Sequence, residues 1–150
     1  MPDVVVTRPL AQAIPFAQRV AAIGRTPVVF PLLEILPLPD QVALKNCLAK
    51  LDDYALIAFV SPNAIEAALT ARPDWPNGIP LAVIGEGSRR KLAEFGITDA
   101  NATIFMPKDV HRTDSQTLLD ALDTSALRGK RVLIIRATCL TGSSRLRIAH

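Results

Sequence analysis

The chain has 150 residues and a formal net charge of +3, and 49% of its residues are hydrophobic and 21% charged. This length and composition are typical of a globular chain of about one domain and argue against a disordered one. No apolar run approaches the roughly 18 residues of a membrane-spanning helix, and the dispersed basic residues with few aromatic ones argue against nucleic-acid binding.

The first 30 residues have the pattern of one β-α-β unit. A β-branched strand is predicted over residues 4–7, a helix over residues 11–24 and a second strand over residues 26–30. Gly24 is expected to end the helix, since glycine is favoured just beyond a helix terminus. The crossover between two parallel strands is expected to be right-handed.

Residues 31–40, PLLEILPLPD, break this pattern with three prolines. Such a density of prolines indicates an edge strand or an extended connector and excludes a central strand. We interpret the segment as a crossing between two domains, and an ordinary loop is the alternative.

From residue 41 the alternation of strands and helices resumes, which indicates a doubly wound α/β sheet. Residues 56–64, LIAFVSPNA, are its centre, because a continuous apolar run is typical of a strand covered on both faces. Ser61 is a favoured N-cap and Pro62 suits the first helical position. The other predicted helices span residues 42–51, 89–95 and 116–122, and the other strands span 81–84, 103–106 and 131–135.

The residues that follow three of the predicted strands are typical of helix starts, which can bind anions. Ser61 and Asn63 follow the central strand, and the run Gly85-Glu86-Gly87-Ser88 follows the next strand. Asp114 and Ser115 can both cap a third helix, and Ser115 is taken as its cap at the predicted site. Helix starts carry unpaired N–H groups and a positive dipole end, and in an open α/β sheet they line one crevice. These residues therefore predict a site for a ligand with several carboxylates or phosphates. The alternative is that the serines are only caps and the glycines only turn residues.

Two arginines, Arg8 and Arg136, each follow a predicted strand and could bind carboxylates in a cleft. Surface salt bridges are the alternative for both. His111 is expected at the surface, Cys47 as filler on a helix and Tyr54 as a packing anchor of the central strand. The isolated cysteines, Cys47 and Cys139, indicate reduced thiols and a cytoplasmic protein.

The sequence contains no pattern typical of a nucleotide-binding glycine loop, a metal cluster or a Ser-His-Asp arrangement. We therefore expect no metal and no cofactor.

The order and spacing of six pieces resemble uroporphyrinogen-III synthase, a family of tetrapyrrole biosynthesis. The pieces are VVVTRPLAQA, PLLEILPLPD, YALIAFVSPNAIEAAL, LAVIGEGSRRKLAEFGI, DSQTLLDAL and GKRVLIIR. The resemblance implies a cofactor-free enzyme that cyclises the linear tetrapyrrole hydroxymethylbilane to uroporphyrinogen III, with loss of water and inversion of ring D through azafulvene and spiro intermediates. It also implies a cytoplasmic monomer without membrane or nucleic-acid partners.

The family has two flavodoxin-like parallel-sheet domains joined by a connector, and the chain returns from the second domain to complete the first. On this basis residues 1–32 are expected to be the β-α-β start of an incomplete first domain. Residues 33–40 are expected to be the connector, and residues 41–150 the second domain.

The last 14 residues, ATCLTGSSRLRIAH, depart from the family pattern, and so does Ala55 where an aspartate is common. We expect a truncated chain with little or no activity and assign no catalytic acid. The resemblance therefore extends only to substrate-binding roles, for Arg8, Ser61, Asn63, Gly85, Gly87, Ser88, Ser115 and Arg136. The alternatives are a non-catalytic α/β anion-binding remnant of this enzyme and a flavodoxin-like nucleotide binder.

Overall fold

The computed structural model describes residues 3–36, 40–109, 112 and 114–136. The chain divides into two compact units, Met1–Pro39 (unit 1) and Asp40–His150 (unit 2). His111, Cys139 and the divergent tail lie outside the described residues. None of the described helices is both long and apolar enough to cross a membrane. The assignment of unit 1 to an incomplete domain stays a prediction.

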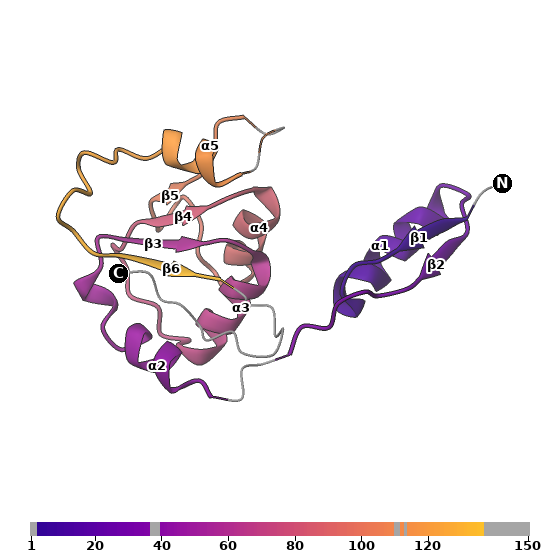
Figure 1. The fold of residues 1–150 in the computed structure, drawn as a ribbon, viewed down its shortest axis with the longest axis horizontal. Coiled ribbons are helices and arrows are strands. Elements are labelled where there is room, and N and C mark those ends of the chain that lie inside the picture. Colours follow the sequence, from indigo (N-terminus) through magenta and orange to yellow (C-terminus); the bar gives the residue numbers. More distant parts are fainter. Residues whose placement is uncertain (1–2, 37–39, 110–111, 113, 137–150) are drawn as a thin grey trace. The chain divides into compact units, whose positions relative to one another are not determined.

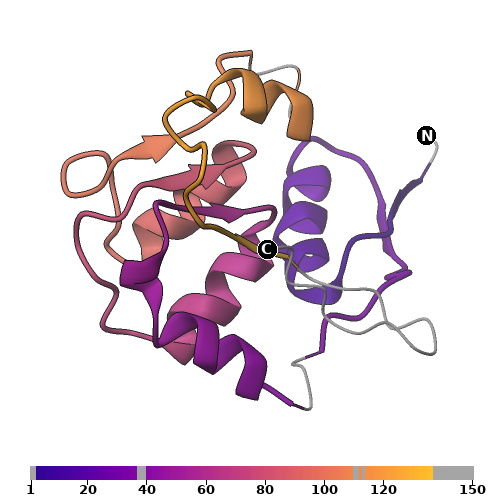
Figure 2. The ribbon, with the colours of Figure 1, turned by 60° about the vertical axis from the view of Figure 1, so that its left-hand side comes forward.

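Unit 1 is the predicted β-α-β unit. Strand β1 (Val4–Val6) pairs in parallel with β2 (Pro27–Val29), and helix α1 (Leu10–Ala22) connects them. Gly24, with φ +74°, follows the helix in the left-handed conformation that glycine adopts most easily. Ala13, Ala17 and Val20 of α1 are buried. Figures 1 and 2 show α1 along one side of the strand pair, with no described element of unit 1 along the other side.

Residues 31–36 of the proline-rich segment form no strand, which favours the extended-connector interpretation over an edge strand for this described part. Residues 37–39 lie outside the described residues, so the connector boundaries of 33–40 stay a prediction.

Unit 2 is an α/β layer structure around a four-stranded parallel sheet in the order β5-β4-β3-β6. Its strands are β3 (Leu56–Phe59), β4 (Leu81–Val83), β5 (Ile104–Phe105) and β6 (Val132–Ile135). Its helices are α2 (Val42–Leu48), the short 3-10 helix η1 (Leu51–Asp53), α3 (Pro62–Ala71), α4 (Glu86–Glu94) and α5 (Ser115–Asp120). The prediction of a parallel α/β fold is confirmed (Figure 1).

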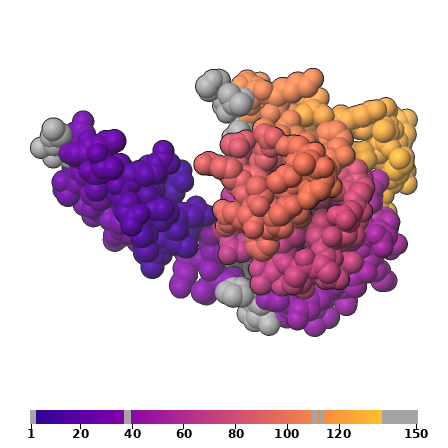
Figure 3. Space-filling model, turned by 180° about the vertical axis from the view of Figure 1, so that it is seen from behind, coloured from indigo at the N-terminus to yellow at the C-terminus, as the bar shows by residue number. Residues whose placement is uncertain are grey.

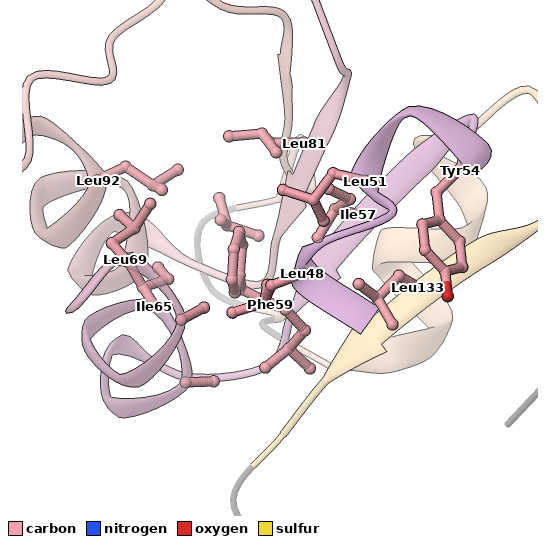
Figure 4. Packing of buried hydrophobic residues seen from close by; sticks show 14 residues of the cluster. Leu48, Leu51, Tyr54, Ile57, Phe59, Ile65, Leu69, Leu81, Leu92 and Leu133 are labelled. Atoms are coloured by element: carbon pink, nitrogen blue, oxygen red, sulfur yellow. The ribbon is translucent and has the colours of Figure 1, made fainter. Parts of the chain in front are cut away.

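Side chains of β3 alternate between two apolar layers, as period-two alternation requires. Ile57 and Phe59 face the larger layer, which includes side chains of α2, α3 and α4, whereas Leu56 and Ala58 face a smaller layer that includes Leu118 of α5. Phe59 is fully buried, and Figure 4 shows it amid the leucine and isoleucine side chains of this layer. Burying one such side chain contributes about 1.5–3 kcal/mol, so the sheet is anchored on both faces at its centre.

Tyr54, just before β3, contacts Arg131, just before β6, and so connects the amino ends of these two strands. Its side chain is only 9% exposed, and the Arg131 guanidinium lies 4.7 Å from the ring centroid and donates a hydrogen bond to the phenol oxygen at 3.3 Å. Arg131 also pairs with Asp53 at 3.2 Å. The predicted packing role of Tyr54 is confirmed, and Cys47 packs beside the same core.

Burial raises the pKa of the Tyr54 phenol above its ordinary value, with a further rise from Cys47 and an opposing effect of Arg131. The unfolded chain therefore loses this proton first as the pH rises. The stability that the neutral phenol contributes is present below about pH 10 and is lost as the pH rises through the folded-state pKa.

Because Tyr54 is the only tyrosine of the chain, phenolate absorbance reports it alone. We expect a titration midpoint above about pH 10 for the folded chain and near 10 in concentrated urea. Equal midpoints in the two states would contradict the burial of this phenol.

Unit 1 is expected to open more easily than unit 2, because an isolated two-stranded sheet is marginal in water. In hydrogen exchange on a dilute sample, the amides of β1 and β2 are expected to exchange much faster than those of β3 and β4. The amides of β3 are the internal control. Comparable protection in both units would show that unit 1 is stable by itself.

Candidate functional site: the carboxyl edge of the four-stranded sheet

Three adjacent strands of unit 2 end at one edge, because β4, β3 and β6 are parallel neighbours. The chain enters the sheet at β3, proceeds outward to β4 and β5, and returns to β6 on the other side of β3. The reversal point of the strand order therefore lies between β3 and β6. In open α/β sheets the crevice outside the carboxyl ends at such a point is the preferred place for a ligand.

The start of α3 matches the sequence prediction. Ser61 is the N-cap, and its hydroxyl oxygen accepts a hydrogen bond from the Ala64 N–H at 3.2 Å, while Pro62 is the first helical residue. This bond occupies the Ser61 oxygen as an acceptor but leaves its O–H free to donate. Among the described residues no acceptor is found for the N–H of Asn63, the second helical residue, so it is available to a ligand.

The start of α4 differs from the prediction. The helix begins at Glu86 and not at Arg89, so Glu86, Gly87 and Ser88 form its first turn and Gly85 is the N-cap. The Gly85 backbone is extended (φ −163°), so this glycine supplies no left-handed turn. No side chain caps α4 within the described chain, which leaves the N–H groups of Glu86 and Gly87 available. Ser88 is 5% exposed and is the one buried polar residue of the described chain.

The starts of α3 and α4 lie side by side. A Cβ atom added to Gly87 would lie 3.9 Å from the Pro62 side chain, an ordinary contact distance. The absence of a side chain at Gly87 keeps the backbone of the first turn of α4 accessible beside α3. Two helix dipoles therefore present their positive ends close together at this edge.

Of the two residues predicted to cap α5, Asp114 is the N-cap and Ser115 is not, so the prediction of a Ser115 cap is wrong. Asp114 is the N-cap, its carboxylate accepts a hydrogen bond from the Thr117 N–H at 2.8 Å, and Ser115 is the first helical residue. Hydrogen bonds from Thr117 lower the pKa of the Asp114 carboxyl, which is therefore negatively charged at neutral pH. Its helix packs on the smaller apolar layer, across the sheet from α3 and α4. The start of α5 is consequently a poor place for an anion.

The two predicted arginines differ in position. Arg136 is exposed and directly follows β6, and the N–H of Val60, directly after β3, donates to the Ile135 carbonyl at 3.2 Å, so Arg136 lies at the reversal point. Arg8 belongs to unit 1, where its guanidinium lies 5.1 Å from the centroid of the Phe16 ring. Among the described residues Arg8 forms no salt bridge, and its predicted substrate-binding role stays a prediction.

Glu86 is a residue of this edge to which the sequence interpretation gave no role. Its carboxylate lies at the positive end of α4, which stabilises the helix, and 3.8 Å from Arg89. Acidic residues are favoured in the first turn of a helix, and this is the sequence signal that could have identified Glu86. Within the described chain no group of three His, Cys, Asp or Glu residues could hold a metal ion. The edge thus offers amide and hydroxyl donors with one arginine, which suits binding of a polyanion.

Comparison with known proteins identifies the family. The model of the family described as "Uroporphyrinogen-III synthase HemD" matches residues 15–141, well over half of the chain. The chain belongs to the uroporphyrinogen-III synthase family. It is 30% identical over 150 residues to the uroporphyrinogen-III synthase of Chlorobaculum parvum, covering 95% of this chain and 56% of that protein. It is 31% identical over 98 residues to the enzyme of Synechococcus elongatus, covering 62% of this chain and 37% of that protein.

The chain thus spans about half the length, or less, of these uroporphyrinogen-III synthases. The family match includes both helix starts and Arg136, whereas Arg8 lies outside it.

Gly87→Ala tests whether this glycine is needed for the fold. Its added Cβ finds room beside Pro62, and alanine is the better helix former, so the free energy of unfolding is expected to rise by up to about 1 kcal/mol. Urea unfolding measures this change.

Gly78→Ala is the matched control. A Cβ added to Gly78 meets no atom within 4 Å, but its φ is +90°, so alanine there is expected to destabilise by about 1–2 kcal/mol. Destabilisation by Gly87→Ala of the same size as by Gly78→Ala would contradict the described start of α4.

Proposed function

We propose that this chain takes part in tetrapyrrole biosynthesis as a uroporphyrinogen-III synthase or its amino-terminal portion, and that its carboxyl sheet edge binds the carboxylates of hydroxymethylbilane. The observation that carries the proposal is the pair of adjoining helix starts of α3 and α4. A linear tetrapyrrole with an acetate and a propionate on every pyrrole needs several anion sites within reach of one another.

The proposed contacts follow from the donors available at this edge. The N–H groups of Asn63, Glu86 and Gly87 and the hydroxyl of Ser61 donate to carboxylates, and the guanidinium of Arg136 forms a charged pair. The Glu86 side-chain carboxylate disfavours an anion close to it and so orients the ligand toward the backbone N–H groups of the α4 start and toward α3. Gly85 and Ser88 contribute through their positions at the start of α4, where Gly85 is the N-cap and Ser88 lies in the first turn.

In the proposed reaction the hydroxyl of the terminal hydroxymethyl group leaves as water, and its carbon remains as the methylene of an azafulvene, which ring D attacks to give a spiro intermediate. Reopening and reclosure of this intermediate invert ring D. The contribution of the protein is to hold the two ends of the chain of pyrroles in the geometry that favours this route, which lowers the entropic part of the barrier. No proton transfer is assigned to a residue of this edge.

A non-catalytic anion-binding module is the second candidate. The described edge offers hydrogen-bond donors and an arginine but no residue to which a proton transfer is assigned, and this favours it. A flavodoxin-like nucleotide binder is the third, since the fold alone accommodates one.

Calorimetric titration with hydroxymethylbilane, uroporphyrinogen III and FMN distinguishes these candidates. We expect binding of the two tetrapyrroles and none of FMN. Arg136→Gln is expected to weaken tetrapyrrole binding about tenfold, which corresponds to about 1.4 kcal/mol. Arg128→Gln, an exposed arginine in the segment before the amino end of β6, is the matched control and is expected to leave binding unchanged.

Turnover is measured separately, as the ratio of type III to type I uroporphyrinogen formed. We expect little type III product from the 150-residue chain, because the described edge offers binding groups only. Formation of type III well above the spontaneous background would contradict this expectation. FMN binding without tetrapyrrole binding would overturn the proposed function itself.

A further inference from the structure

Unit 2 has a cavity of about 160 Å³ at the amino edge of its sheet, opposite to the carboxyl edge described above. The segment that leads into β4 and the segment that follows α4 line it together with Leu81, the first residue of β4. Figure 3 shows α4 and the segment after it, in pink and salmon, at the surface of unit 2. Two of the lining residues, Pro73 and Gly96, are exposed, so a small molecule can enter the cavity from solvent.

Trp75, which lines this cavity, has a hydrogen-bond donor that is not used. Its indole N–H is buried and has no acceptor among the described residues. The ring is held in place by Phe59 of the larger apolar layer, with 5.9 Å between the two ring centroids. Buried donors in folded proteins are almost always paired, because an unpaired one is costly. An acceptor on a ligand would remove this cost.

The other lining side chains determine what kind of molecule fits. Among the described residues that line the cavity none is charged, so an ion would lose its hydration there without compensation. Six lining side chains besides Trp75 are apolar: Pro73, Pro76, Ile79, Leu81, Phe95 and Ile97. The volume is close to the roughly 150 Å³ of a cavity that holds one benzene molecule. The cavity therefore suits a single uncharged ring.

We propose that this cavity binds a small uncharged molecule of one aromatic ring that carries a hydrogen-bond acceptor, and that the indole N–H of Trp75 donates to this acceptor. The apolar side chains hold the ring, and the hydrogen bond fixes its orientation. Because the indole nitrogen is buried in the free chain, the indole turns toward the cavity as the bond forms.

Titration of the ¹⁵N-labelled 150-residue chain with pyridine and with benzene tests the proposal by NMR, at a pH at which pyridine is uncharged. The two rings have nearly the same shape, but only pyridine has an acceptor. Trp75 is the only tryptophan of the chain, so its indole N–H gives a single signal. We expect pyridine to move this proton signal downfield, because the proton enters a hydrogen bond, and benzene not to do so. A signal that pyridine leaves in place, or that both rings move alike, overturns the proposal.

Trp75→Phe removes the donor and keeps an aromatic ring beside Phe59. It is expected to weaken pyridine binding about fivefold relative to benzene binding, which is the effect of one neutral hydrogen bond. The amide shifts of Gly96 and Ile97 measure both affinities in the variant, and urea unfolding shows that it is folded. An unchanged ratio of the two affinities overturns the assignment of Trp75 as the donor.

Asn77→Ala is the matched control, because Asn77 also lines the cavity and its exposed side-chain amide is the alternative donor. The side-chain amide of Asn101 already donates to the Gly96 carbonyl at 2.7 Å. Asn77→Ala is expected to leave the ratio of pyridine to benzene affinity unchanged. A loss of pyridine binding in Asn77→Ala that is absent in Trp75→Phe overturns the proposed hydrogen bond.

This inference is independent of the proposed tetrapyrrole binding, because the two sites lie at opposite edges of the sheet. Saturation of the chain with uroporphyrinogen III is therefore expected to leave the pyridine-induced shift of the Trp75 indole unchanged. Competition between the two ligands would contradict the separate location of the cavity.

Discussion

The parallel pairing of β3 with β4 on one side and β6 on the other is the constraint on which the rest of the structure depends. Because the three strands run in the same direction, every segment that follows them starts at one edge of the sheet. The pairing is held from both faces by the two apolar layers and at its amino end by Tyr54 and Arg131. Because these contacts stabilise the sheet at its faces and at its amino end, the carboxyl edge consists of helix starts and not of core side chains.

The helices that follow β3, β4 and β5 differ in what accepts the hydrogen bonds of their first N–H groups, and this difference decides where an anion fits. At α3 a serine hydroxyl satisfies one amide, at α5 a charged aspartate does so, and at α4 no side chain does. A negative N-cap stabilises its own helix but repels an anionic ligand, whereas an uncapped start retains its donors. The anion site that we propose therefore includes the starts of α3 and α4 but not that of α5, and it is smaller than the three-helix site expected from the sequence.

Much of the fold is predictable from the sequence because its local signals agree with one another. The continuous apolar run before Ser61, the N-cap and Pro62 all indicate a buried strand that leads directly into a helix, and the structure has this arrangement. The sequence predicts the start of α4 at Arg89 and not at Glu86 for two reasons. Glycine is a weaker N-cap signal than serine or aspartate, and two glycines in four residues favour a turn. Asp114 and Ser115 are both good N-caps, so composition alone could not choose between them. The proximity of Gly87 and Pro62 is a tertiary contact that no local pattern contains.

The central claim is that the adjoining starts of α3 and α4 receive carboxylates. Amide chemical shifts of the ¹⁵N-labelled chain, followed by NMR during titration with uroporphyrinogen III, test it most directly. The account predicts the largest shifts at the amides of Asn63, Glu86 and Gly87 and little change at Thr117, whose N–H is already bonded to Asp114. Shifts concentrated at the start of α5, or no shifts at the starts of α3 and α4 at saturating ligand, would contradict it.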